Sequence, residues 1–255
     1  EMLRSLVGSE MCIRDRNAKQ IDQLLEGFLK RGLPGCGLKV VQYGNTLYEG
    51  YFGVTDIDTK TPVTKDTLFR QASMSKIPLY TVMMMLYERG KFLLTDPIGD
   101  YLPEWKTSTR YDRHPNGYVD IVPTSRPINI RDVMSMKCGL PYCNSAAPTH
   151  DLVMTGMQEC MQPLWEKGSY TLKEHLSAMS KAPLACDPGT HWIYGFSSEL
   201  AAGIIEAVCD KPVNDVFKEM LFDPLGMKDT AAIFPDEQTK NRLVTLYANC
   251  LLYTS

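Results

Sequence analysis

The chain has 255 residues, of which 44% are hydrophobic and 22% charged, the balance of an ordinary globular protein. Its formal net charge is −3, and its lysines and arginines are scattered, so no basic tract could follow nucleic acid or an anionic membrane. The longest apolar stretches are also far shorter than a membrane span, and we expect no transmembrane segment.

Eight cysteines are present, but none forms a Cys-x-x-Cys pair or a Cys/His cluster with metal-ligand spacing. We therefore predict buried, reduced thiols that act as small apolar side chains, with no bound metal and no other cofactor. Reduced thiols slightly favour a cytoplasmic location and leave a periplasmic or secreted one open. Six of the eight cysteines lie between residues 17 and 249: Cys36, Cys138, Cys143, Cys160, Cys186 and Cys209.

The two ends of the chain differ from the rest. The segment SLVGSEMCIRDR, residues 5–16, has no helical or strand periodicity and no signal-peptide pattern, and it resembles a translated sequencing-adapter tract. The final CLLYTS, residues 250–255, resembles another. We expect residues 1–16 and 250–255 to be non-native tails around an incomplete domain at 17–249. The alternative is an N-terminal arm and a C-terminal strand.

The first elements predicted are a helix and a β-hairpin. In NAKQIDQLLEGFLKRG, residues 17–32, apolar side chains recur on one helical face, and Gly32 follows the end of the helix. The stretches CGLKVVQY and TLYEGYFG read as two strands around a turn at Gly44-Asn45.

The stretch QASMSKIPLY, residues 71–80, raises the main question about function. The sequence after Ser73 is apolar almost all round, which predicts a buried helix that ends at Gly90. Ser73 and Lys76 are three residues apart, so a helix would place them on the same face. A serine with a base one turn away could be a nucleophile, but Ser-x-x-Lys also arises by chance.

The remaining chain is read as loops and helices. Residues 93–139 contain five prolines and predict loops and short helices. Further helices are predicted in INIRDVMSMKCGL, over residues 151–182, in SSELAAGIIEAV and after Pro212. No repeat, low-complexity tract or linker marks a domain boundary.

Six ordered blocks resemble the serine β-lactamase-related family, which includes class C β-lactamases, D-alanyl-D-alanine carboxypeptidases and similar esterases. This resemblance implies an α/β (α+β) fold of the β-lactamase and penicillin-binding transpeptidase type. An antiparallel sheet flanked by helices would join a mainly helical lobe, with the C-terminal strands missing here. The blocks span residues 21–234: LKVVQYGNTLYEGYFGVTD, TLFRQASMSK, LTDPIGDYLPEW, INIRDVMSMKCGLP, PGTHWIYGFSSELAAGIIEAV and LFDPLGMKDT.

The resemblance also implies a site. Ser73 would be the nucleophile, Lys76 and Tyr194 would serve as general base and acid, and the Ser73 N–H would be one oxyanion donor. Lys76 can accept a proton at neutral pH only if its pKa is lowered, which we expect from burial in the apolar helix. The partner would be a small acyl substrate, an ester or an amide.

Each of these residues also has an ordinary structural explanation. Ser73 could cap a helix, Lys76 could be a surface lysine, and Tyr194 could be a core tyrosine with a satisfied hydroxyl. The methionines at 83–85 are expected to fill the core. The four histidines receive no role.

Two departures from the family pattern affect the expected function. Phe196 stands where the β-lactamases have the Asn of Tyr-x-Asn, which holds the substrate amide, so β-lactams are disfavoured and esters favoured. Ser197 could substitute for that Asn if the loop shifts by one residue. No strand with the family's Lys- or His-x-Gly motif appears before Asn249. We therefore expect the chain as written to be poorly folded and poorly active.

Two classes of function remain. The first is a serine hydrolase that forms an acyl-enzyme on Ser73. The second is a non-catalytic member that binds penicillin-like or acyl ligands, or an inactive fragment. Stable acylation without turnover would favour the second class. The natural substrate and the oligomeric state do not follow from the sequence.

Overall fold

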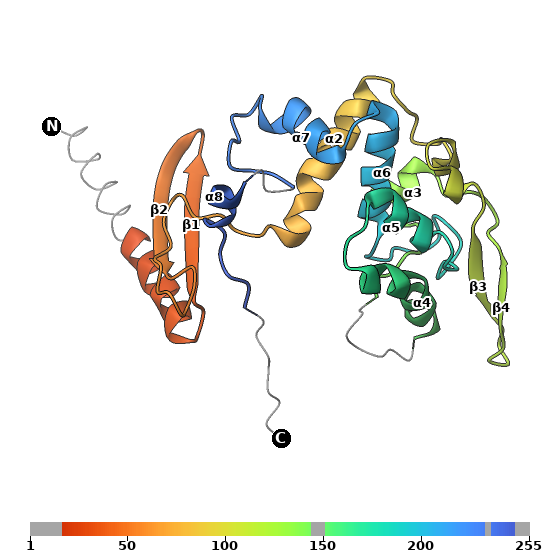
Figure 1. Cartoon of the computed structure of the whole chain (residues 1–255), viewed down its shortest axis with the longest axis horizontal. Coiled ribbons are helices and arrows are strands. Elements are labelled where there is room, and N and C mark those ends of the chain that lie inside the picture. The colour runs from red at the N-terminus through yellow and green to blue at the C-terminus, as the bar shows by residue number, and fades with distance from the viewer. Residues whose placement is uncertain (1–16, 144–150, 233–235, 248–255) are drawn as a thin grey trace, which may run out of the picture. The chain divides into compact units, whose positions relative to one another are not determined.

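The computed structural model describes residues 17–143, 151–232 and 236–247 (Figure 1). The adapter-like tracts predicted at 5–16 and 250–255 lie outside these described residues. The chain divides into two compact units, one formed by residues 1–71 and 233–255 and the other by residues 72–232. Nothing in the composition around residues 71 and 72 marks this boundary.

The first unit contains a helix over residues 17–30 and an antiparallel hairpin of β1 (Gly35–Gln42) and β2 (Asn45–Gly53). The helix lies along the hairpin (Figure 1), and the Tyr48 hydroxyl donates to Asp22 Oδ1 at 2.6 Å. The predicted helix and hairpin are both confirmed.

The hairpin turn lies one residue earlier than predicted. The strands pair up to Gln42 and Asn45, so the two turn residues are Tyr43 and Gly44. Their φ angles are 47° and 77°, the left-handed conformation that both central residues of a type I′ turn require. Asn45 is the first residue of β2 instead.

The segment after residue 235 returns to the first unit. The short helix α8 (Glu237–Lys240) begins there, and Leu243 then forms a parallel bridge with Leu68. The Thr245 hydroxyl donates to Asp56 Oδ2 at 2.7 Å. These contacts attach the segment to the loop that follows β2.

The second unit is mainly helical. Its one hairpin among the described residues, β3 (Thr109–Arg113) with β4 (Val119–Pro123), corrects the expectation of only loops and short helices over 93–139. Only Tyr111 of these two strands is buried, so no alternating apolar pattern marks them. The helical elements are η1 (Ala72–Ser75), α2 (Lys76–Glu88), η2 (Ile98–Asp100), η3 (Pro103–Trp105), α3 (Ile130–Met134), α4 (Leu152–Lys167), α5 (Leu172–Met179), α6 (Ser197–Cys209), α7 (Val213–Phe217) and the π-helical turn η4 (Lys218–Phe222).

The core of the second unit forms around α2 and α6, which pack against each other. Met83 is fully buried, as predicted for a core methionine, but Met84 is 40% exposed and Ile77 67% exposed. The helix α2 is therefore not buried on all sides. Gly90 follows its end with φ of 66°, as expected. The two helices bury Leu79, Val82, Met83, Leu86, Leu200, Ala201, Ile204 and Ile205.

The six cysteines within the described ranges are free thiols, and only Cys138 is buried. The other five are half-buried, so the prediction of full burial holds for one thiol only. Within the same ranges, no helix is long and apolar enough to cross a bilayer. No group of three or more His, Cys, Asp or Glu side chains there could hold a metal ion.

Candidate active site

Ser73 lies in η1, directly before α2, and its side chain is exposed. The residue before it, Ala72, has φ of 44°, a left-handed conformation that costs a non-glycine residue about 1–2 kcal/mol. The N-cap of α2 is Ser75, whose Oγ donates to the Ala72 carbonyl at 2.6 Å. Ser73 is therefore not the cap of this helix, and its oxygen makes other contacts.

Lys76 and Tyr194, the two residues expected beside Ser73, both contact its side-chain oxygen. The Tyr194 hydroxyl donates to Ser73 Oγ at 2.5 Å, and Lys76 Nζ donates to the same oxygen at 3.3 Å. Lys76 is half-buried and Tyr194 is 41% exposed. The structure thus brings the three residues together, and Tyr194 is not a core tyrosine.

A fourth residue, Tyr142, completes the cluster and was not singled out from the sequence. Its hydroxyl oxygen accepts a hydrogen bond from Lys76 Nζ at 3.1 Å. Its ring meets the Tyr194 ring edge to face, with centroids 5.5 Å apart. No spacing in the sequence links residue 142 to residue 76, because tertiary folding alone brings them together.

The electrostatics of the cluster differ from the expectation. Burial lowers the pKa of the Lys76 ammonium, but hydrogen bonds with Tyr142 and Tyr194 outweigh burial and leave that pKa raised. The hydrogen bond with Ser73, followed by that with Lys76, lowers the pKa of the Tyr194 hydroxyl. The predicted lowering of the Lys76 pKa is therefore wrong, because this half-buried amine has phenol partners.

Phe196 and Ser197 are buried, and Phe196 packs directly against Tyr142 of this cluster. Phe196 is 7% exposed, and its ring packs edge to face against Tyr142 and His175, with centroid separations of 4.8 Å and 5.7 Å. Ser197 is fully buried beside the Cys138 thiol, and within the described residues its Oγ has no aligned hydrogen bond. Ser197 Oγ does not face solvent in this geometry.

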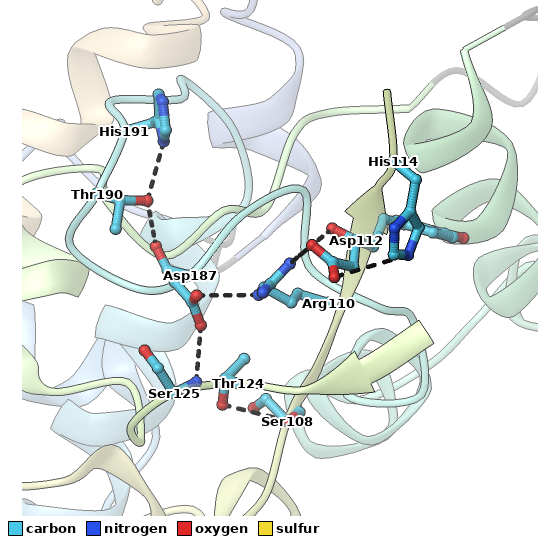
Figure 2. Close-up of polar contacts among 10 residues, drawn as sticks. Ser108, Arg110, Asp112, His114, Thr124, Ser125, Asp187, Thr190 and His191 are labelled. Carbon is cyan, nitrogen blue, oxygen red and sulfur yellow. Dashed lines mark hydrogen bonds and ion pairs between the residues drawn. The ribbon is translucent and has the colours of Figure 1, made fainter. Parts of the chain in front are cut away.

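The loop that leads to Tyr194 is fixed by an ion-pair network (Figure 2). Asp187 accepts a hydrogen bond from the Ser125 backbone N–H at 2.7 Å and pairs with Arg110 Nε at 2.9 Å. The Ser125 N–H and then Arg110 hold the pKa of the Asp187 carboxyl below its usual range. The network continues over β3, where Asp112 lies between Arg110 and His114. It attaches the loop to the β3–β4 hairpin.

A second anchor lies under Gly189 in the same loop. The Asp132 carboxylate, 5% exposed, accepts two hydrogen bonds from Arg126 at 2.6 and 2.9 Å and one from the Asn129 N–H at 2.9 Å. Gly189 has φ of 84°, and a Cβ there would overlap Arg126 Nη2 and crowd Asp132 Oδ1. Only glycine lets the loop pass this close to the buried ion pair.

The described residues thus place Ser73 directly before α2, with Lys76 Nζ and the Tyr194 hydroxyl on its side-chain oxygen. The Beta-lactamase family model matches residues 19–249, and the chain belongs to that family.

Curated relatives include enzymes of several kinds. The chain is 25% identical over 215 residues to esterase EstB of Burkholderia gladioli, covering 83% of this chain and 50% of that protein. It is 24% identical over 218 residues to the D-alanyl-D-alanine-carboxypeptidase/endopeptidase AmpH of Escherichia coli K12, covering 85% and 50%. The chain thus spans about half the length of these relatives.

Solved structures confirm the predicted fold class. The chain is similar to EstCE1, a hydrolase with promiscuous acyltransferase activity, with a TM-score of 0.75 and 23% identity over 92% of this chain and 57% of that one. It is also similar to a class C β-lactamase, with a TM-score of 0.65 and 20% identity over 91% and 55%.

Proposed function

We propose that this chain carries the nucleophile of a serine hydrolase that acts on ester or amide substrates through an acyl-enzyme on Ser73. The observation that carries the proposal is the convergence of Tyr194 OH and Lys76 Nζ on Ser73 Oγ, at 2.5 and 3.3 Å. A serine hydroxyl needs such a neighbour to take its proton. An esterase and a carboxypeptidase among the relatives support the same reaction class.

Tyr194 is the base in this proposal, and Lys76 is the cation that favours its ionised form. The lowered pKa of the Tyr194 hydroxyl increases its ionised fraction near neutral pH, whereas the hydrogen bonds that Lys76 Nζ donates to Tyr142 and Ser73 favour the ammonium form of the lysine. As Tyr194 takes the Ser73 proton, Ser73 Oγ bonds to the carbonyl carbon of the substrate. The bond to the leaving group then breaks, and Tyr194 returns the proton to that group.

Water then hydrolyses the acyl-enzyme by the same steps in reverse order. It attacks the acyl carbon and gives a proton to Tyr194, and the bond from that carbon to Ser73 Oγ breaks as the proton returns to the serine. The Ser73 N–H would stabilise the oxyanion in both steps, a contribution of about 3 kcal/mol for one such donor.

Esters are the substrates that the site supports best. By the family resemblance, Phe196 stands where the β-lactamases present an amide, and its ring is buried against Tyr142 and His175. It cannot hydrogen-bond a substrate amide, and a substrate that needs such a partner is disfavoured.

The test is active-site labelling of the whole chain with a fluorophosphonate, followed by intact mass spectrometry. Ser73 Oγ displaces fluoride from phosphorus, so one phosphonyl adduct is expected on the chain and on Ser73. The Ser73→Ala variant should lose the adduct, and the Ser75→Ala variant, changed in the same turn, should keep it. A folded chain that takes no adduct, or takes it elsewhere, would contradict the proposal.

Turnover separates the substrate classes. We expect a short-chain nitrophenyl ester to be hydrolysed faster than nitrocefin. Fast nitrocefin hydrolysis would contradict the preference for esters, and stable acylation without turnover would favour a ligand-binding member over an enzyme.

A further inference from the structure

Tyr142 is placed beside Tyr194 by backbone pairing. Pro141 and Gly195 form an antiparallel bridge, and the Phe196 N–H donates to the Leu140 carbonyl at 3.0 Å. In an antiparallel pair the next residues on either side also lie opposite each other, so Tyr142 faces Tyr194. A Cβ on Gly195 would overlap the Leu140 carbonyl oxygen, so this close approach requires glycine.

Lys76 lies between the two tyrosines. Its Nζ is 3.1 Å from Tyr142 OH, closer than the 3.3 Å that separates it from Ser73 Oγ. The same nitrogen lies 5.6 Å from the ring centroid of Tyr142 and 5.0 Å from that of Tyr194. An ammonium group has three donors and no acceptor, so it suits a site made of hydroxyl oxygens and aromatic rings.

We propose that Tyr142 is a positioning residue of the Ser73 site, whose hydroxyl oxygen holds Lys76 as an ammonium ion and thereby leaves Tyr194 to take the Ser73 proton. This inference rests on the proposed function, because it assigns the support on which the Tyr194 base depends. The hydrogen bond that Lys76 Nζ donates to Tyr142 is also the larger of the two phenol hydrogen bonds that raise the Lys76 pKa against the effect of burial.

Two other titratable groups face this cluster. Glu199, in the first turn of α6, is half-buried; when ionised, it attracts the Lys76 ammonium and opposes ionisation of Tyr194. Tyr80, one turn along α2, donates to the Val133 carbonyl at 3.4 Å, and burial raises its pKa. Neither supplies a hydroxyl oxygen hydrogen-bonded to Lys76, so Tyr142 has no substitute within the described residues.

Tyr142→Phe tests the inference, because it removes one hydroxyl and keeps the ring contacts with Tyr194 and Phe196. Tyr80→Phe is the matched control, since it also removes a phenol oxygen near α2 but leaves Lys76 untouched. The rate of fluorophosphonate labelling is measured for each chain from pH 5 to 10. The loss of one hydrogen bond to a charged group predicts a rate about tenfold lower at pH 7 for Tyr142→Phe.

The direction of the pH shift discriminates between mechanisms. Without the Tyr142 oxygen, the Lys76 ammonium is less favoured, so Tyr194 should ionise at higher pH and the rising limb of the profile should move to higher pH. If Lys76 were the base, the same change would free its neutral form and move the limb to lower pH. A shift to lower pH, an unchanged profile, or an equal effect of Tyr80→Phe would overturn the inference.

A second readout does not depend on activity. Tyrosine labelled with ¹³C at Cζ reports the ionisation of each phenol by NMR, and the Tyr194→Phe variant assigns the Tyr194 signal. Tyr194 should titrate at higher pH in Tyr142→Phe than in the unchanged chain, and an identical titration would overturn the inference. Failure of the proposed function is distinct, because then the unchanged chain itself takes no label on Ser73.

Discussion

Replacement of Asp132 by asparagine should destabilise the helical unit. The Asp132 side chain is 5% exposed and accepts three hydrogen bonds, two from Arg126 and one from the Asn129 N–H. Asparagine keeps one acceptor oxygen but replaces the other with an NH2 group, which cannot accept the hydrogen bonds that Arg126 and the Asn129 N–H donate. Arg126 then keeps its charge without a carboxylate partner.

The magnitude follows from the burial of each partner. Removal of one member of a buried pair costs about 3–5 kcal/mol, and the Arg126 side chain is 40% exposed, so water can solvate part of its charge. We therefore expect a loss at the low end, about 3 kcal/mol. For a unit of this size, the corresponding fall in Tm is roughly 6–12 °C.

Tryptophan fluorescence during urea unfolding measures this loss selectively. The three tryptophans, Trp105, Trp165 and Trp192, all belong to the unit formed by residues 72–232. Asp112→Asn is the control, because the Asp112 side chain is 40% exposed and its pair with Arg110 should contribute little to stability. If Asp132→Asn lies within about 1 kcal/mol of the unchanged chain, or if the control costs as much, the reasoning from burial is refuted.

Three further changes test other features. Ala72→Gly should stabilise the chain by about 0.5 kcal/mol in urea unfolding, because glycine accepts the left-handed φ of 44° without strain, and a loss of stability would contradict this. Glu199→Gln should stabilise the chain at pH 7 but not near pH 4. Burial raises the Glu199 pKa, so its favourable contribution exists at acid pH and is lost as pH rises through the folded pKa; an equal difference at both pH values would refute this. Gly195→Ala should slow Ser73 labelling more than tenfold, because its Cβ displaces Leu140 and separates the two tyrosines; an unchanged rate would count against the bridge.

The proximity of Ser73, Lys76 and Tyr194 could be predicted because ordered blocks of sequence contain all three. Ser73 and Lys76 are close in the chain, and Tyr194 lies in a block that resembles a known motif. The hairpin at 109–123 was missed because its strands are short and only Tyr111 in them is buried: β3 reads TRYDR, with three charges in five residues, and β4 reads VDIVP. The turn at Tyr43 was misplaced because a Gly-Asn pair read as the turn itself, whereas strand pairing extends to Asn45.

Tyr142 and the Lys76 pKa were missed for a different reason. Both depend on contacts between residues 66 positions or more apart, which only the folded chain creates. The expectation for Lys76 counted burial alone, whereas two phenols distant in the sequence, Tyr142 and Tyr194, together outweigh burial. The sequence indicated which side chains meet, but the pKa of each depends on its partners in the folded chain.

The bridge between Pro141 and Gly195 also makes one backbone amide a reporter of the whole cluster. The Phe196 N–H is bonded to the Leu140 carbonyl, so it exchanges with deuterium only when the two segments separate. That same separation would part Tyr142 from Tyr194. A ligand that binds the hydroxyls of both Tyr142 and Tyr194 should therefore slow exchange of the Phe196 N–H without contacting Phe196. The protection factor of this one amide would then report how strongly a compound stabilises the contact between the two segments.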